Sequence, residues 1–184
     1  MGILRTISNL IDQLSRKVGI GMAWLTLAVV IIGAVNAVLR SLGKVFQLEL
    51  SSNTIIELQW HLFATIFLLG AAYTLQQNSH VRVDVLYDRL SLRKRLWVNL
   101  VGHVVFLIPF CLFMLWVCWP KFIGSWRELE QSPDPGGLPV YTIITMLPVA
   151  FLLLMLQGIS EVIKNGLALV SGEQESEALG EVIS

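Results

Sequence analysis

Four long apolar runs, separated by short polar segments, are the main feature of the hydrophobic pattern. They cover residues 18–39, 58–76, 97–119 and 140–163. A helix rises about 1.5 Å per residue, so each run is long enough to cross a hydrocarbon layer of roughly 30 Å. None of the runs alternates apolar and polar residues as a barrel strand would, and a helix satisfies its own backbone hydrogen bonds in lipid. The pattern therefore predicts an all-α membrane protein with four transmembrane helices.

The segment before the first run, residues 1–17, has a helical repeat of its own. Apolar residues recur every three or four positions, and polar residues take the other side. The apolar positions are Ile3, Leu4, Ile7, Leu10, Ile11 and Leu14, and the polar ones are Arg5, Asn9, Asp12, Gln13, Arg16 and Lys17. This pattern predicts an amphipathic helix that lies in the inner membrane interface. A signal peptide is the competing interpretation, but the polar lead is long and no convincing cleavage site follows the apolar run.

Composition agrees with a membrane protein. Hydrophobic residues make up 55% of the chain and charged residues 14%, which lies outside the range of soluble globular domains. Acidic and basic residues balance at 13 each, and we expect no nucleic-acid partner. The acidic, small-residue-rich segment 170–184 is expected to be a mobile tail of a single membrane domain, residues 1–184.

The basic residues predict the orientation. With the N-terminus inside, nine lie on the inner side and four on the outer side, which the positive-inside rule favours. Segment 78–95 is then a basic cytoplasmic connector, segment 120–139 is a periplasmic loop, and both termini are cytoplasmic. Aromatic residues fit this frame as interfacial anchors, with Trp97 at the inner boundary and Trp60, Trp116, Trp119 and Tyr141 near outer boundaries.

The cysteines and histidines carry the candidate redox chemistry. Cys111 and Cys118 lie on one helix face and form no C-x-x-C pair, so buried packing is the stronger interpretation. His61 and His103 raise the possibility of a haem held between helices. Their predicted depths differ by roughly 15 Å at helical rise, whereas two ligands of one iron must be level. Packing histidines are therefore favoured, and no cofactor is expected in this chain.

The acidic residues near the spans have structural explanations. Glu57 opens the second span, where a carboxylate meets the positive end of the helix dipole, and Arg40 at the outer end of the first span is its predicted partner. Glu161 has Lys164 three residues on, a spacing that brings the two side chains together. No span holds an unpaired acid at mid-depth. Such a chain is a poor candidate for moving an ion by itself.

The outer loop is predicted to have a fixed shape. A short polar helix around Trp126 precedes a cluster of Pro133, Pro135, Gly136, Gly137 and Pro139, which forces a turn. The loop is either a shaped connector or a docking surface. Small residues in the first two spans, Gly33, Ala37, Gly70 and Ala71, also favour close packing of helices.

The connector contains the most specific motif. In "HVRVDVLYDRLSLRKR", Asp84 is placed to cap a short helix that carries Arg89, and His80 and Asp84 together shape an inner hairpin. With the preceding "FATIFLLGAAYTLQQNS", this segment resembles the DctQ-type small membrane subunit of tripartite ATP-independent periplasmic (TRAP) transporters. The matching His-Val-x-Val-Asp element is formed by His80, Val81, Val83 and Asp84. The segment from Ser132 to Lys164 is further similar to the branch labelled mannitol or chloroaromatic type.

The resemblance implies a transporter subunit of the bacterial inner membrane and not an enzyme. Its partners would be membrane lipid, a large multi-span permease of the DctM type that holds the substrate and sodium sites, and a periplasmic binding protein that delivers an organic acid anion. The small subunit would brace the fixed part of the large one. Under this hypothesis His80 and Asp84 position the second and third helices, and the loop 125–139 faces the binding protein. The rival hypotheses are a haem or quinone anchor of a respiratory enzyme and a stand-alone small transporter or thiol enzyme.

Overall fold

The computed structural model describes residues 2–47, 52–78 and 90–171. Its helices are α1 (Gly2–Phe46), α2 (Asn53–Gln76), α4 (Leu92–Val101), η1 (Gly102–Leu107), α5 (Ile108–Glu128) and α6 (Val140–Ser171). Because α4, η1 and α5 follow one another without a break, four continuous helical rods are long and apolar enough to cross a membrane. The prediction of an all-α, four-span membrane protein is confirmed. His80, Asp84, Arg89 and the C-terminal tail lie outside the described residues.

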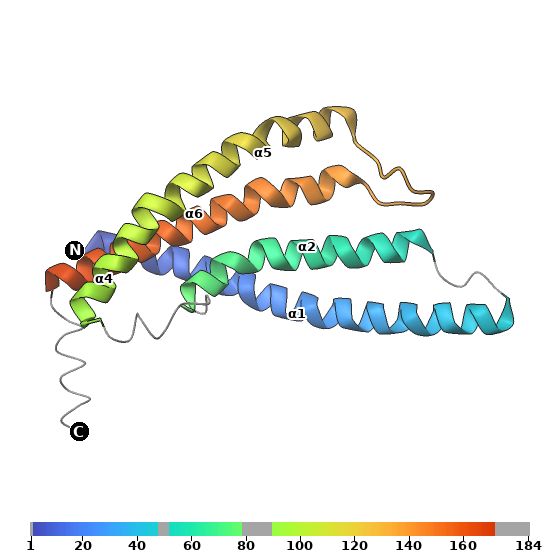
Figure 1. The fold of residues 1–184 in the computed structure, drawn as a ribbon, viewed down its shortest axis with the longest axis horizontal. Helices are drawn as coiled ribbons and strands as arrows, with labels where there is room; N and C mark the ends of the chain where they lie inside the picture. Colours follow the sequence, from blue (N-terminus) through green and yellow to red (C-terminus); the bar gives the residue numbers. More distant parts are fainter. Residues whose placement is uncertain (1, 48–51, 79–89, 172–184) are drawn as a thin grey trace, which may run out of the picture.

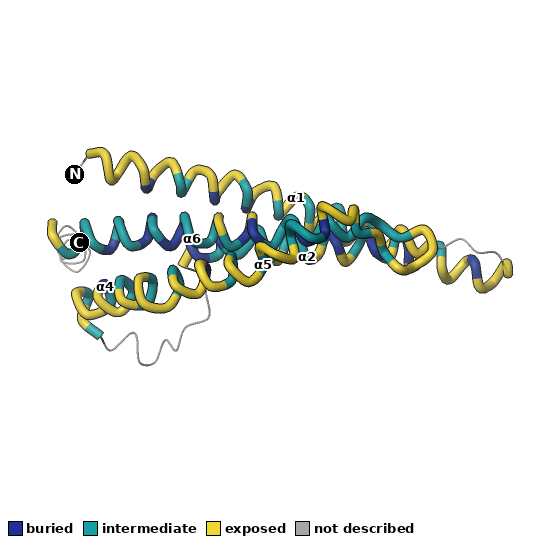
Figure 2. The backbone as a smooth tube through the Cα atoms, turned by 90° about the horizontal axis from the view of Figure 1, so that it is seen from above, coloured by how far each residue is buried: buried dark blue, intermediate teal, exposed yellow. Residues whose placement is uncertain are grey.

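The four rods lie side by side in the order α5, α6, α2, α1 (Figure 1). The N-terminal part of α1 also crosses α6 next to the C-terminal end of α6. We call this end of the layer the inner end, because it is the one predicted to face the cytoplasm, and the opposite end the outer end. Buried positions gather on α6 and α2, whereas α1 and α5 at the two edges expose most of their length (Figure 2). The layer is therefore thin, and its edge helices each use only one face for internal packing.

The packing face of α1 repeats every seven residues. Ser8, Ser15, Asn36 and Gly43 are buried and differ by multiples of seven. A seven-residue period keeps one face of a helix against its neighbours over a long distance, and small residues at these positions let the backbones approach closely. The segment 1–17 was predicted as a separate interfacial helix, and its described residues, 2–17, form the beginning of this single 45-residue helix. Its apolar positions point outward, with Ile3, Leu10 and Leu14 exposed.

Gly19 marks the closest approach of α1 and α2. A Cβ atom added at this glycine would lie 2.2 Å from Cγ of Tyr73, whose ring rests on the glycine backbone. We expect Gly19→Ala to lower the melting temperature of the purified protein, because overpacking of this kind costs about 1–3 kcal/mol. Gly21→Ala is the matched control, since nothing lies within 4 Å of that position and alanine favours the helix. Equal melting temperatures for the two variants would contradict the observed contact.

The third rod, which is formed by α4, η1 and α5, contains an irregularity that was not predicted. Residues Gly102–Leu107 form a π-helical turn immediately before Pro109, which cannot donate a backbone hydrogen bond and clashes with a regular preceding turn. Here Leu107 packs into the notch left by Gly158, where an added Cβ would lie 2.8 Å from the leucine Cδ2. Farther along, Cys111 is fully buried and Cys118 partly buried. Their seven-residue spacing thus belongs to a packing face.

Candidate functional site

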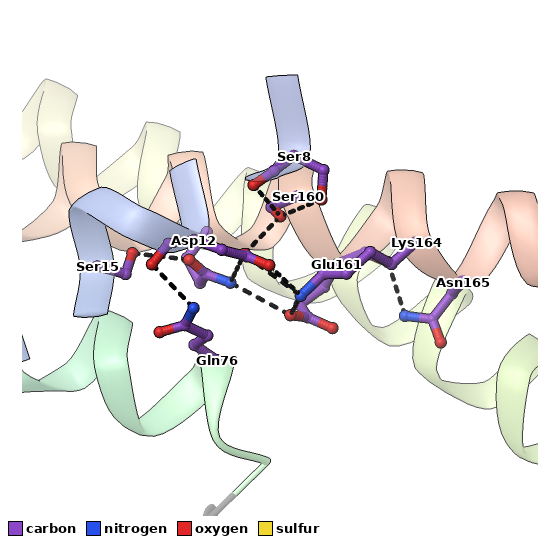
Figure 3. Close-up of polar contacts among 9 residues, drawn as sticks. Ser8, Asp12, Ser15, Gln76, Ser160, Glu161, Lys164 and Asn165 are labelled. Carbon is purple, nitrogen blue, oxygen red and sulfur yellow. Dashed lines mark hydrogen bonds and ion pairs between the residues drawn. The ribbon is translucent and has the colours of Figure 1, made fainter. Parts of the chain in front are cut away.

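A cluster of polar side chains joins α1, α2 and α6 near the inner end of the layer (Figure 3). Asp12 of α1 is its centre. Its Oδ1 accepts hydrogen bonds from Gln157 Nε2 at 2.9 Å and from Ser160 Oγ at 2.8 Å. Its Oδ2 lies 3.0 Å from Lys164 Nζ. We call this group, with Ser8, Ser15, Gln76 and Glu161, the inner cluster.

The remaining members of the inner cluster extend these bonds. Ser8 and Ser160 hydroxyls are 2.7 Å apart, and Ser15 donates to Gln157 Oε1 at 2.7 Å. Gln76 Nε2 at the end of α2 donates to the backbone carbonyl of Asp12 at 2.9 Å. The predicted pair of Glu161 and Lys164 is present, with 2.5 Å between Oε1 and Nζ. Helices α1, α2 and α6 are thus held together at one level.

The bonds of the inner cluster connect helices and have a structural role. One ammonium group bridges two carboxylates, and fully buried Gln157 uses both ends of its amide on partners within the chain. Buried polar groups are costly unless they are bonded, so a satisfied network fixes one packing arrangement. Asp12 was predicted on the polar side of an interfacial helix, and the sequence pattern did not point to Ser8, Ser15, Gln157 or Ser160.

A second group, the outer cluster, lies where α2 meets the loop before α6. Glu57 accepts hydrogen bonds from the Ser132 hydroxyl and from the backbone N–H of Leu138. The predicted partner was Arg40, but Arg40 is exposed on α1, and no ion pair joins the two among the described residues. That prediction is wrong because the carboxylate binds the loop. Glu57 therefore fastens a distant segment of chain to the head of α2.

The first turn of α2 holds the loop at two further points. Asn53 Nδ2 donates to the carbonyl of Pro135 at 3.3 Å, and Thr54 Oγ1 donates to the carbonyl of Gly136 at 2.6 Å. Gly136 has φ +74°, a conformation that glycine adopts without strain. At Gly137 a Cβ atom would lie 2.7 Å from Glu57 Oε1, so the glycine lets the backbone reach the carboxylate. The predicted turn is thus shaped by contacts with α2.

The other predicted outer residues surround this loop. Trp126 Nε1 donates to Thr145 Oγ1 at 2.8 Å, and its indole also contacts Tyr141. Trp60 is half exposed and its ring contacts His61. Lys121 of α5 donates to Glu130 of the loop at 2.8 Å, and this hydrogen bond lowers the pKa of the Glu130 carboxyl below its usual value. Glu57, Trp60, Trp126 and Pro135 are thus brought to one end of the protein.

The two histidines are far apart. His61 Nδ1 lies 2.9 Å from the carbonyl oxygen of Glu57, near the outer end of α2. Leu107 packs against Gly158, beside Gln157 of the inner cluster, and is therefore level with the inner end of α2. His103 lies in η1, one turn farther inward than Leu107. The rise of the helices then places His61 and His103 roughly 28 Å apart along the helix axes. This geometry does not favour a haem shared between them, and the described residues contain no group of three potential metal ligands.

The comparison with protein families decides the class of protein. Residues 48–166 match the model of the DctQ component of tripartite ATP-independent periplasmic transporters. The chain belongs to the DctQ family. It is therefore the small membrane subunit of a TRAP transporter, and this DctQ protein crosses the membrane several times. The assignment to the mannitol or chloroaromatic branch stays a prediction. Neither the comparison with curated proteins nor that with solved structures gave a match.

The family match has a definite position on the fold. It runs from the loop before α2 into the last part of α6, so it includes the outer cluster and leaves α1 outside. The inner cluster therefore joins a matched helix, α6, to an unmatched one. In this DctQ protein α1 is held in place through its own residues, such as Asp12, and these lie outside the matched range.

Proposed function

We propose that this DctQ subunit is the fixed scaffold of a sodium-coupled TRAP transporter in the bacterial inner membrane, with both termini cytoplasmic. A DctM-type large subunit holds the sodium and substrate sites and moves against it. A periplasmic binding protein delivers the substrate, an organic acid anion. The resemblance at the connector and the family match support this assignment of partners.

One observation carries the scaffold role. Buried Glu57 at the outer end, and half-buried Asp12 with buried Glu161 at the inner end, bind other parts of the same chain. These bonds fix helix positions at both ends of the layer, which suits a part that stays still while a partner moves. The broad exposed faces of α1 and α5 leave room for a large membrane partner.

The outer loop supports docking of the binding protein. Its backbone is held to α2 at Pro135, Gly136 and Leu138, so it presents one shape to the periplasm. Trp126 is 45% exposed and Leu129 is 56% exposed beside it, and exposed aromatic and apolar side chains on a rigid base are typical of protein interfaces. The loop is then an interaction surface that needs no rearrangement.

Purification tests the proposal most directly. A tagged chain, extracted from its native membrane in mild detergent, should retain a large multi-span permease at equal stoichiometry and show no Soret absorption. Proteoliposomes that contain both subunits should take up substrate with binding protein and a sodium gradient, and those with the large subunit alone should lose most of this uptake. A Soret band, a chain that is active alone, or uptake unaffected by omission of the chain would overturn the scaffold role.

A further inference from the structure

The inner ends of α2 and of the third rod do not match in polarity. Gln76 at the end of α2 binds Asp12, Asp12 binds Gln157, and the neighbouring Gly158 packs against Leu107. These contacts put Gln76 and Leu107 at one level across the layer. At this level α2 turns polar with Gln76, Gln77 and Asn78, whereas the third rod continues apolar to Trp97, about ten residues and 15 Å farther inward.

The apolar surface inward of Leu107 is exposed. Phe106 is 72% exposed, and the other exposed apolar side chains of this stretch are Trp97, Val98, Val101, Val104 and Val105. If the membrane boundary ran straight across the layer at Gln76, this whole surface would stand in water. Contiguous exposed apolar surface of this kind is uncommon outside lipid or an interface.

The outer ends differ in the opposite sense. Trp126 binds Thr145, and Glu57 binds Leu138 just before α6, so Phe63 of α2 is roughly level with Trp126 of α5. Lys121 lies about 7 Å farther inward on α5. Phe63 is exposed and lies in an apolar run, whereas Lys121 is exposed and charged. The apolar part of α5 therefore ends about 10 Å inward of the apolar part of α2.

The stagger continues in the same direction at α1. Asn36 of α1 donates to Gln59 near the start of α2 at 3.0 Å, yet the apolar run of α1 continues to Leu39, a further turn outward. Figure 1 shows α1 reaching farther outward than α2 and the loop before α6. From α1 through α2 and α6 to α5, the apolar segments are thus displaced progressively inward.

We propose that the lipid bilayer crosses the helix layer obliquely, so that its hydrocarbon contacts a diagonal belt from the outer part of α1 to the inner part of α4. A mean shift of about 12 Å across two helix spacings of about 9 Å corresponds to a tilt of about 35°. This lies within the range of tilts seen for membrane helices. The occupant of the exposed face from Trp97 to Phe106 is lipid hydrocarbon.

This inference concerns the lipid contact alone and does not depend on the proposed function.

Two pairs of cysteine variants test the tilt in the native membrane. Gln77→Cys and Phe106→Cys are level at the inner end, and at the outer end Lys121→Cys lies somewhat inward of Phe63→Cys. A membrane-impermeant maleimide is applied to opened vesicles, with the unaltered chain as the background for Cys111 and Cys118. Because maleimide needs a hydrated thiolate, Gln77→Cys and Lys121→Cys should label at least about tenfold faster than their partners.

A nitroxide carried on a lipid distinguishes the two reasons why a site would label slowly, which are contact with lipid and coverage by a protein. Bimane attached to Phe106→Cys and Phe63→Cys in detergent should be quenched by spin-labelled lipid after reconstitution of the complex. Fast aqueous labelling of Phe106→Cys would show an upright layer and overturn the inference. Slow labelling without lipid quenching would show that a protein covers this face and would overturn it as well. All four sites should label equally after denaturation in dodecyl sulfate, which confirms that each thiol is present.

Discussion

Replacing Asp12 by Ala should lower the free energy of unfolding of the purified protein by about 3 kcal/mol, because the change removes the centre of the inner cluster. Gln157 and Ser160 lose a charged acceptor, and Lys164 keeps only Glu161. Gln157 is fully buried, so its amide cannot turn to water for a replacement. For a protein of this size the melting temperature should fall by roughly 6–12 °C in detergent.

The control for Asp12→Ala lies on the same helix. Asn9 is exposed on α1, and Asn9→Ala should leave the melting temperature nearly unchanged. Asp12→Asn should fall between the two variants, since it keeps one acceptor oxygen and loses the ion pair with Lys164. If Asp12→Ala and Asn9→Ala melted together, the inner cluster would not be what holds α1 to α6.

The spans were predictable because each apolar run is a local signal, and such a run must form a helix in lipid to satisfy its backbone hydrogen bonds. The partners of the inner cluster are not local. Ser8, Asp12 and Ser15 share a face at spacings of four and three, and so do Gln157, Ser160 and Lys164 at spacings of three and four. Both patterns are visible in the sequence. Neither one says that the two faces meet, because the residues are more than 140 positions apart.

Glu57 illustrates a correct residue with a wrong partner. Its place at the head of a span marked it as important, and Arg40 at the outer end of the first span was its predicted partner. The structure satisfies the carboxylate with a hydroxyl and a backbone N–H from the loop. Charge pairing is easier to predict from sequence than backbone N–H donation, since the second depends on the path of the loop. The proline and glycine cluster predicted the turn and could not predict where the turn would be fastened.

The π-helical turn and the stagger of the spans were also beyond local reasoning. Pro109 lies just after the π-helical turn, and the packing of Leu107 against Gly158 accompanies the turn. Likewise, the apolar runs gave the length of each span and not the relative height of one span against another. Those heights come from contacts between helices, such as Gln76 with Asp12, and they turn four separate predictions into one oblique membrane belt.

Replacing Glu57 by Ala should impair uptake through the docking of the binding protein, since it frees the outer loop from the head of α2. Ser132 and the Leu138 N–H lose their common acceptor, and the loop then occupies its docking shape for only part of the time. If that part is about one tenth, the concentration of binding protein needed for half-maximal uptake rises about tenfold, while uptake at saturating binding protein is preserved. Glu57→Gln, which keeps an acceptor, should show a smaller rise, and Asn9→Ala, exposed on α1 at the other end of the layer, should show none. The measurement is uptake by proteoliposomes of the complete membrane complex across a series of binding-protein concentrations. A lower maximum at an unchanged half-maximal concentration would contradict a docking role and would mean that Glu57 matters for the integrity of the subunit alone.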